Sequence, residues 1–318
     1  MSALESELSI EAPGLEDLRA AQERLRSHVR RTPVLRLSVP TPDGPREGIF
    51  KLELLQVTGV FKVRGAFNAL LQSRAHKVLA CSGGNHGLAV AHAASILGKH
   101  AVIFVPTSAA RLKVEGMKGL GADVRVEGGS PKEAFRAAGD MARVSGLPMI
   151  HPYDQAEVIA GQGTLGLELL EQAPEVRHWL MAVGGGGLAA GCSIAFGGQA
   201  SVIPVEPAGC PGLHKAQRAG HPVAVQSEGC ASTSLGPPSL GLLPWAILRD
   251  RVGPCALVDE PAIWKAQRWL WASARLVVES GGAVALAALM SGVWLPPDNE
   301  PVGVVLCGGN TDALPPCE

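Results

Sequence analysis

The chain lacks an excess of either charge and any long apolar run, and each absence excludes a class of protein. Lys and Arg number 28 against 29 Asp and Glu, which gives a net charge of -1. No basic field is therefore available to attract nucleic acid or an anionic membrane. No apolar stretch is long enough to span a bilayer, so the sequence predicts neither a nucleic-acid-binding nor a membrane protein.

Paired cysteines and an export signal are also missing. The seven cysteines are scattered and odd in number, and no C-x-x-C pair occurs. This pattern argues against a disulfide framework and against a zinc site, so we predict no bound metal. The first residues are acidic and polar, without the basic and apolar regions of a leader peptide. We therefore expect a protein of the reducing cytoplasm.

What the chain does contain is enough apolar sequence for a large core. Its 318 residues are 47% hydrophobic and 18% charged, which is typical of a globular protein, and the length suits two lobes. Short apolar strands alternate with amphipathic helices, a rhythm that favours an α/β fold with parallel sheets covered on both faces. Strands are expected at residues 49–52, 78–81, 101–105, 124–126, 179–183, 202–205 and 302–306. Helices are expected at residues 15–29, 62–73, 85–97, 108–120, 131–144, 158–172, 261–275 and 283–289.

Four short segments carry chemistry. The first is Thr58-Gly59-Val60-Phe61-Lys62-Val63-Arg64-Gly65, in which Lys62 begins a predicted helix. An amine attacks an aldehyde only when it is unprotonated, and burial at a helix start lowers the pKa of a lysine. Phe61 is suited to packing beside a flat ring. Taken alone, Phe61-Lys62 is more often an ordinary surface lysine beside a core phenylalanine.

The second segment is a glycine tetrad between a buried strand and a helix, formed by Gly184, Gly185, Gly186 and Gly187 and followed by Leu188. Converging N–H groups and the positive helix end make such a loop a phosphate site. Two alternatives remain open. One is a plain turn. The other is a dinucleotide fingerprint, because Gly185, Gly187 and Ala190 match G-x-G-x-x-A and Glu206 ends the next strand.

The other two segments are also glycine turns that follow predicted strands. Ser82-Gly83-Gly84-Asn85-His86-Gly87 offers a hydroxyl, an amide and loop N–H groups that can hold a carboxylate, although such a loop is often only a helix cap. Cys307-Gly308-Gly309-Asn310 places a cysteine at a strand end. A single cysteine in that position is usually a small buried hydrophobe.

Together and in this order, the four segments resemble the fold-type-II pyridoxal-phosphate (PLP) enzymes, and within them the serine/threonine dehydratases and serine racemases. The resemblance runs from Arg31 to Asn310. It implies a tryptophan-synthase-β-like fold of two doubly wound α/β domains with mainly parallel sheets. It also implies a large PLP-binding domain at residues 1–76 and 153–318, interrupted by a small domain at residues 77–152. Family members are commonly dimers or tetramers, so a homo-oligomer is expected.

The resemblance also implies roles for single residues. Lys62 would hold the cofactor covalently and act as the catalytic base, and Phe61 would contact the cofactor ring. Asn85 would bind the ring hydroxyl and Cys307 the pyridine nitrogen, while Glu279 lies in a matching stretch near the cofactor. The phosphate would lie on the residues of the glycine loop, which are Gly184, Gly185, Gly186, Gly187 and Leu188. The substrate carboxylate would lie on Ser82, Gly83, Gly84, Asn85 and His86.

The chain departs from its relatives in ways that bear on the reaction. Racemases place a serine where this chain has Gly83, and metal-bound relatives carry a carboxylate shortly after the residue that matches Glu206. We therefore expect β-elimination of L-threonine or L-serine to a 2-oxo acid and ammonia. A serine racemase or a dehydratase of another 3-hydroxy amino acid is the alternative. A dinucleotide-binding oxidoreductase and a non-catalytic binding protein are the hypotheses from other classes.

Overall fold

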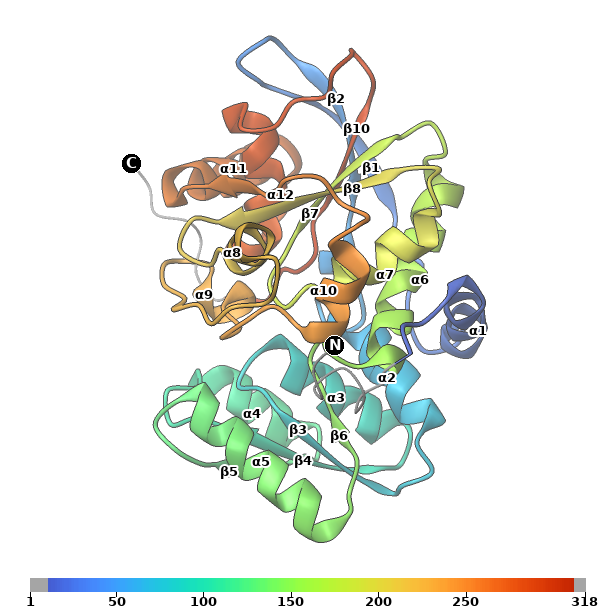
Figure 1. The fold of residues 1–318 in the computed structure, drawn as a ribbon, viewed down its shortest axis with the longest axis vertical. Helices are drawn as coiled ribbons and strands as arrows, with labels where there is room; N and C mark the ends of the chain where they lie inside the picture. The colour runs from blue at the N-terminus through green and yellow to red at the C-terminus, as the bar shows by residue number, and fades with distance from the viewer. Residues whose placement is uncertain (1–10, 312–318) are drawn as a thin grey trace.

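The computed structural model describes residues 11–311 and contains two separate β-sheets (Figure 1). Within the larger sheet only β1 and β2 pair antiparallel, and every other neighbouring pair is parallel. In spatial order its strands are β1 (Val34–Val39), β2 (Arg46–Lys51), β10 (Val302–Val305), β7 (His178–Ala182), β8 (Ser201–Pro207) and β9 (Ala256–Val258). Strands from both ends of the sequence thus meet in this sheet.

The second sheet is wholly parallel and comes from one continuous stretch of sequence. In spatial order its strands are β5 (Asp123–Val126), β4 (His100–Val105), β3 (Lys77–Cys81) and β6 (Met149–Ile150). In Figure 1 this sheet and the helices α4 and α5 make up the lower part of the molecule. The exact division of the chain into domains at residues 77 and 152 remains a proposal.

Helices connect the strands and cover both sheets. In Figure 1, α11 and α12 lie on one side of the larger sheet and α6 and α7 on the other, which is a doubly wound arrangement. The helices are α1 (Leu15–Leu25), α2 (Lys62–Gln72), α3 (Asn85–Ile96), α4 (Arg111–Gly119), α5 (Pro131–Ser145), α6 (Ala156–Gln172), α7 (Gly187–Phe196), α8 (Gly212–Ala219), α9 (Ser232–Leu235), α10 (Leu242–Leu248), α11 (Glu260–Ala274) and α12 (Ser280–Ser291). A short 3₁₀ helix, η1, spans Glu53–Leu55.

The α/β class and the parallel sheets are confirmed, and every element that the sequence predicts is present in some form. The helix expected at residues 15–29 is shorter, because α1 ends at Leu25 and a turn follows. The sequence patterns missed β1, β6, β9 and the helices α8, α9 and α10. β6 and β9 have two and three residues, too few for a periodic pattern to emerge.

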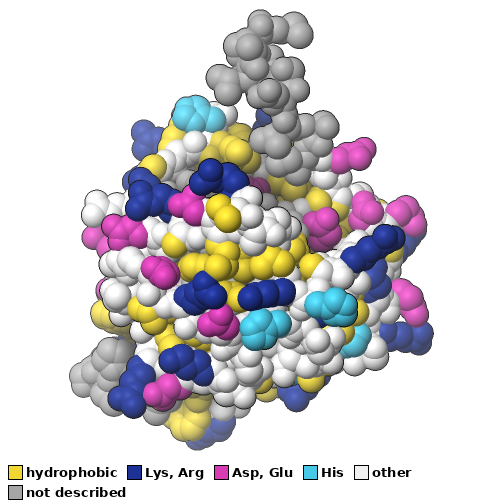
Figure 2. Space-filling model, turned by 90° about the horizontal axis from the view of Figure 1, so that it is seen from below, with side chains coloured by type: hydrophobic (Ala, Val, Ile, Leu, Met, Phe, Trp, Pro, Cys, Tyr) yellow, Lys and Arg dark blue, Asp and Glu magenta, His cyan; other side chains and the backbone are white. Residues whose placement is uncertain are grey.

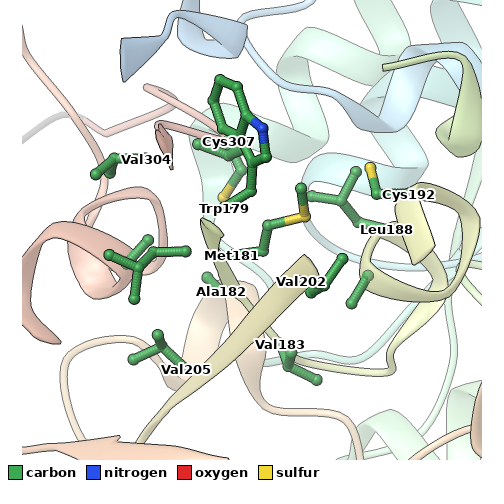
Figure 3. Packing of buried hydrophobic residues seen from close by; sticks show 14 of the residues in the cluster. Trp179, Met181, Ala182, Val183, Leu188, Cys192, Val202, Val205, Val304 and Cys307 are labelled. Carbon is green, nitrogen blue, oxygen red and sulfur yellow. The ribbon is translucent and has the colours of Figure 1, made fainter. Parts of the chain in front are cut away.

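The core of the larger half lies around β7. Trp179 is fully buried, and all ten residues of α7 are buried. Met181 points from the strand toward Leu188 and Cys192 of α7 (Figure 3). Small residues allow this close packing, because a Cβ on Gly191 would lie 2.5 Å from the carbonyl oxygen of Ile159 in α6. The tight packing fixes the loop that joins β7 to α7.

The surface carries no field of one sign on the face that Figure 2 shows, where acidic and basic side chains are interspersed. None of the helices that the structure describes is long and apolar enough to cross a membrane. The six cysteines that it describes are all free thiols, while Cys317 lies outside the described residues.

Candidate active site

One cavity brings together residues from all four segments that the sequence singled out. The space between its walls, counted together with the solvent at its mouth, is about 490 Å³. It lies where β7 gives way to α7 and beside the start of α2. Its lining consists of Phe61, Lys62, Asn85, Ala182, Gly184, Gly185, Gly186, Gly187, Leu188, Ala189, Ser234, Leu235, Glu279, Gly281 and Cys307.

Lys62 is the first residue of α2, and burial favours the neutral form of its amine. Nζ donates a hydrogen bond to the carbonyl oxygen of Pro152 at 2.9 Å and lies 5.0 Å from the centre of the Phe61 ring. Burial lowers the Lys62 pKa from 10.5 to about 8, although the nearby Cys307 and Glu279 act in the opposite direction. A fraction of the amine is therefore unprotonated near neutral pH, as an attack on an aldehyde requires.

The segment before Lys62 is tied to the segment that carries Cys307. The Phe61 N–H donates to the carbonyl oxygen of Cys307 at 3.1 Å, and Gly309 donates to Gly59 at 2.9 Å. Gly59 has a φ of 73°, a left-handed conformation that glycine adopts without strain. These bonds hold Lys62 and Cys307 at fixed positions on one cavity.

Two residues further along, Arg64 anchors α2 in a buried ion network. Its guanidinium binds Glu53 with two hydrogen bonds of 2.8 Å and also binds Glu168 at 2.7 Å. Burial raises the pKa of Glu53, but the charge and hydrogen bonds of Arg64, together with Lys51 and Thr32, outweigh it and the pKa ends below its ordinary value. Lys51 joins Glu168 on the other side. No sequence pattern pointed to this network beyond the presence of Arg64 in the lysine segment.

The glycine tetrad forms the N-terminal approach to α7. Gly186 has a φ of 92°, which lets the chain turn sharply into the helix. The backbone N–H groups from Gly184 to Leu188 donate no hydrogen bond to any acceptor within residues 11–311. Free donors at a helix N-terminus attract an anion, and here they line the cavity without a lysine or arginine among them.

Cys307 lines the same cavity with a neutral thiol. It follows β10, is 3% exposed, and its Sγ lies 3.7 Å from the carbonyl oxygen of Gly281. Burial, reinforced by the charge of Glu279, raises the Cys307 pKa to about 12. The thiol therefore stays protonated across the physiological range.

Asn85 lies at the start of α3, and both the nitrogen and the oxygen of its side-chain amide form hydrogen bonds. Its Nδ2 donates to Glu279 at 2.8 Å, and its Oδ1 accepts from Nδ2 of Asn310 at 3.0 Å. Burial raises the pKa of Glu279, while the bond from Asn85 acts against that rise. The structure thus links the Ser82 loop to the last glycine segment, which supplies Asn310.

The remaining residues of the Ser82 loop do not line this cavity. Gly84 faces the carbonyl oxygen of Thr233, and the His86 ring bonds to the carbonyl oxygen of Ile150 at 2.9 Å. Burial and the charge of Lys62 lower the His86 pKa to about 3, so the ring is uncharged. In this loop the N–H groups at the start of α3, rather than the imidazole, are placed to meet a carboxylate.

Ser234, Leu235 and Gly281 also line the cavity, and the sequence did not single them out as site residues. Ser234 and Leu235 come from the four-residue helix α9, which is too short to produce a pattern. A Cβ on Gly281 would lie 2.3 Å from the hydroxyl oxygen of Ser234. The need for glycine at position 281 follows from this contact, which exists only in the folded chain and leaves no pattern in the sequence.

Glu206 does not face the glycine tetrad as a free carboxylate. One oxygen accepts from the N–H of Leu213 at 2.7 Å and the other from the N–H of His214 at 2.9 Å, at the start of α8. Burial raises its pKa to about 7. Both oxygens are occupied by the protein, so Glu206 is not available to a ribose in the way that the dinucleotide hypothesis requires. Within residues 11–311 no three His, Cys, Asp or Glu side chains form a possible metal site.

The cavity residues fit pyridoxal phosphate. The Lys62 amine, whose pKa is lowered, can bond to the aldehyde of the cofactor. The N–H groups at the start of α7 can bind a dianionic phosphate. Phe61 adds an apolar ring surface, and Cys307 adds a neutral group that can meet a ring nitrogen. Each part of the cofactor thus has a chemical partner among the residues present.

Comparison with known proteins also indicates a pyridoxal-phosphate enzyme. The family model described as "Pyridoxal-phosphate dependent enzyme" matches residues 25–308. An L-threonine ammonia-lyase of Thermotoga maritima is 35% identical over 94% of this chain and 76% of its own. A serine racemase of Oryza sativa is 32% identical over 95% and 92% of the two chains. A phenylserine dehydratase of Ralstonia pickettii is 35% identical over 95% and 94%.

Solved structures agree with these relatives. A pyridoxal 5'-phosphate-dependent aspartate racemase superposes with a TM-score of 0.88 at 30% identity, over 97% of this chain and 99% of the other. A threonine deaminase of T.th. superposes with a TM-score of 0.86 at 35% identity, over 95% and 99%. The similarity therefore covers both sheets and the cavity.

Proposed function

This chain belongs to the family of pyridoxal-phosphate dependent enzymes, and we propose that it eliminates water from a 3-hydroxy amino acid such as L-threonine or L-serine, after which one water molecule hydrolyses the released imine and frees ammonia. The products would be a 2-oxo acid and ammonia. The observation that carries this proposal is the meeting of Lys62, the free N–H groups of the glycine tetrad and the neutral Cys307 on one cavity. When bound, the cofactor supplies an electron sink for the bonds broken at Cα.

In this proposal each residue has one task. The neutral amine of Lys62 removes the Cα proton, and its pKa of about 8 suits a base that works near neutral pH. The N–H groups from Gly184 to Leu188 hold the phosphate. The Ser82 loop and the start of α3 would hold the substrate carboxylate, and Asn85, which bonds to Glu279 and Asn310, would bind the ring hydroxyl. Cys307 would meet the ring nitrogen without adding charge, because its pKa is raised to about 12.

Gly83 favours elimination over racemisation. A racemase needs an acid–base group on each face of Cα, and Lys62 can serve only one. Gly83 has no side chain to serve the other, and a Cβ there would lie 2.7 Å from the Cβ of Ala109. Serine racemases, a phenylserine dehydratase and threonine ammonia-lyases all resemble this chain. The comparisons therefore do not determine which substituent the substrate carries on Cβ.

The test is a steady-state assay of the PLP-reconstituted protein against L-serine and L-threonine in deuterated water. We expect release of pyruvate or 2-oxobutanoate with an equal amount of ammonia, and D-serine at a much lower rate. Failure to release any 2-oxo acid contradicts the proposal. D-serine formed as fast as pyruvate would establish the racemase alternative. We also propose a cytoplasmic homo-oligomer, whose assembly state sedimentation can measure.

A further inference from the structure

Three aromatic rings form two contacting pairs, with His151 in the middle, in a chain that has few Phe, Trp or Tyr residues. Only 4% of the residues are Phe, Trp or Tyr, and Tyr153 is the single tyrosine. The Phe135 and His151 ring centres lie 5.5 Å apart at 78°, and those of His151 and Tyr153 lie 4.7 Å apart at 87°. Both pairs are edge-to-face, the geometry that aromatic rings prefer. We call Phe135, His151 and Tyr153 the aromatic row.

The row lies at the edge of the smaller sheet where the Ser82 loop also lies. β3 ends at Cys81, immediately before that loop, and β6 ends at Ile150, immediately before His151. β5 leads into α5, whose second turn contains Phe135. Because the strands of this sheet are parallel, all these strand ends lie on one edge, where open α/β sheets bind their ligands.

The inner end of the row touches the candidate site. The Tyr153 ring packs directly on the glycine tetrad, since a Cβ on Gly185 would lie 2.2 Å from its Cγ. Lys62 donates to the carbonyl oxygen of Pro152, which lies between His151 and Tyr153 in the sequence. The row thus leads from the edge of the smaller sheet to the catalytic lysine.

The outer end of the row is open and has no packing role in the core. Phe135 is 40% exposed and belongs to none of the buried hydrophobic clusters. Its helix is already fixed to the sheet by Ala134 and Ala138, which are fully buried. An aromatic ring that faces water beside a ligand-binding edge gains free energy when an apolar group covers it.

The row is also uncharged. Nδ1 of His151 accepts N–H bonds from Asp154 at 2.8 Å and from Tyr153 at 3.3 Å. Burial lowers the His151 pKa to about 4, although Asp154 acts against this change, so the imidazole is neutral at physiological pH. A charged β-substituent would find no counter-ion on these three rings, whereas an aryl group would find ring edges and faces.

We propose that the aromatic row determines specificity by contacting the substituent on the substrate Cβ, and that it selects 3-hydroxy amino acids that carry an aryl group there. This inference rests on the proposed function and names its substrate class. Phe135 contacts the substituent from the side of the smaller sheet, and Tyr153 contacts it from the side of the glycine tetrad. Serine would leave the exposed Phe135 ring in water.

The experiment compares kcat/KM for L-threo-3-phenylserine and L-serine in the parent, in Phe135→Ala and in Val144→Ala. Val144 is a matched control, because it is an apolar residue of the same helix and is 84% exposed. We expect the parent to prefer phenylserine and Phe135→Ala to reduce the phenylserine-to-serine ratio by about tenfold, as expected for the loss of one apolar contact. Val144→Ala should keep the parental ratio. An unchanged ratio in Phe135→Ala, or an equal loss in both variants, overturns the proposal.

A binding measurement separates this inference from the proposed function. Calorimetry on the PLP-loaded protein gives the Kd for L-phenylalanine and L-alanine, neither of which has a β-hydroxyl to lose. Tighter binding of L-phenylalanine, reduced about tenfold in Phe135→Ala, supports the row even if no hydroxy amino acid is eliminated. If L-alanine binds as tightly as L-phenylalanine, the row has no specificity role. Phe135→Leu, which keeps the apolar volume without the ring, should lie between the parent and Phe135→Ala.

Discussion

The two sheets contribute to one cavity but are built in different ways. On the side of the larger sheet, all ten residues of α7 are buried and α12 has ten buried residues among its twelve. On the side of the smaller sheet, α4 buries only Met117, and α5 buries only Ala134 and Ala138. The proposed phosphate, ring and lysine positions therefore belong to a tightly packed half, whereas Phe135 belongs to a helix with thinner packing.

The difference in packing indicates which residues must keep fixed positions for the chemistry and which can be substituted. A cofactor has one shape, so the residues that hold it benefit from a rigid setting of buried ion pairs and close glycine contacts. Substrates differ in their β-substituents, and half-exposed helices tolerate substitution without loss of the core. We therefore expect substitutions around Lys62 to have large effects and substitutions in α5 to change selectivity.

The largest effect is expected for Lys62→Ala, which removes the proposed base from the rigid half. Loss of a general base alone costs about two to four orders of magnitude in rate. The matched control is Lys132→Ala in α5, an exposed lysine of the other half, which should keep the parental rate. Borohydride reduction followed by peptide mass mapping provides a second measurement, and the cofactor should be found on Lys62. Near-parental turnover of Lys62→Ala, or a cofactor on another lysine, contradicts the assignment.

A smaller effect, on stability rather than rate, is expected for Arg64→Met. This change leaves the buried Glu53 without its guanidinium, while Glu168 keeps its pair with Lys51, and an unpaired buried charge costs about 3–5 kcal/mol. Arg125→Met is the matched change in the smaller sheet, where Arg125 pairs with Asp123 and both side chains are 37% exposed. Exposed pairs contribute about 0–1 kcal/mol.

Urea unfolding of the cofactor-free protein measures both variants. If Arg125→Met destabilises the protein as much as Arg64→Met, the contrast between the two halves is wrong. A loss confined to Arg64→Met would instead show that the buried network holds the start of α2 in place. The activity of surviving Arg64→Met protein then reports how far the position of Lys62 depends on that network.

How much the sequence could predict follows the same division. The strands that lead into glycine turns were predictable because each combines a short apolar run with a turn signal. The cavity gathers Asn85, the tetrad and Cys307 from these turns, and Lys62 from the start of α2. The buried partners of Arg64 were not, because Glu53 and Glu168 lie 11 and 104 residues away and carry no local pattern. The aromatic row was missed for a similar reason, since Phe135 and His151 come from different elements.

The smallest effect is expected at Cys307, and it tests whether the rigid half needs a thiol or only a neutral group. A hydroxyl can make the same neutral hydrogen bond, whose net value of about 1 kcal/mol corresponds to roughly a fivefold change, so Cys307→Ser should stay within that factor of the parental elimination rate. Cys307→Asp places a carboxylate beside the ring nitrogen, which would keep the ring protonated and retain electrons that elimination must release, so it should be slower. Cys81→Ser supplies the control, because that thiol is also buried, with a pKa raised to about 11, and it ends a strand of the other sheet outside the cavity. Rapid-mixing kinetics with L-threonine compare the three variants. An aspartate variant that eliminates as fast as the parent would show that the charge beside the ring does not set the reaction.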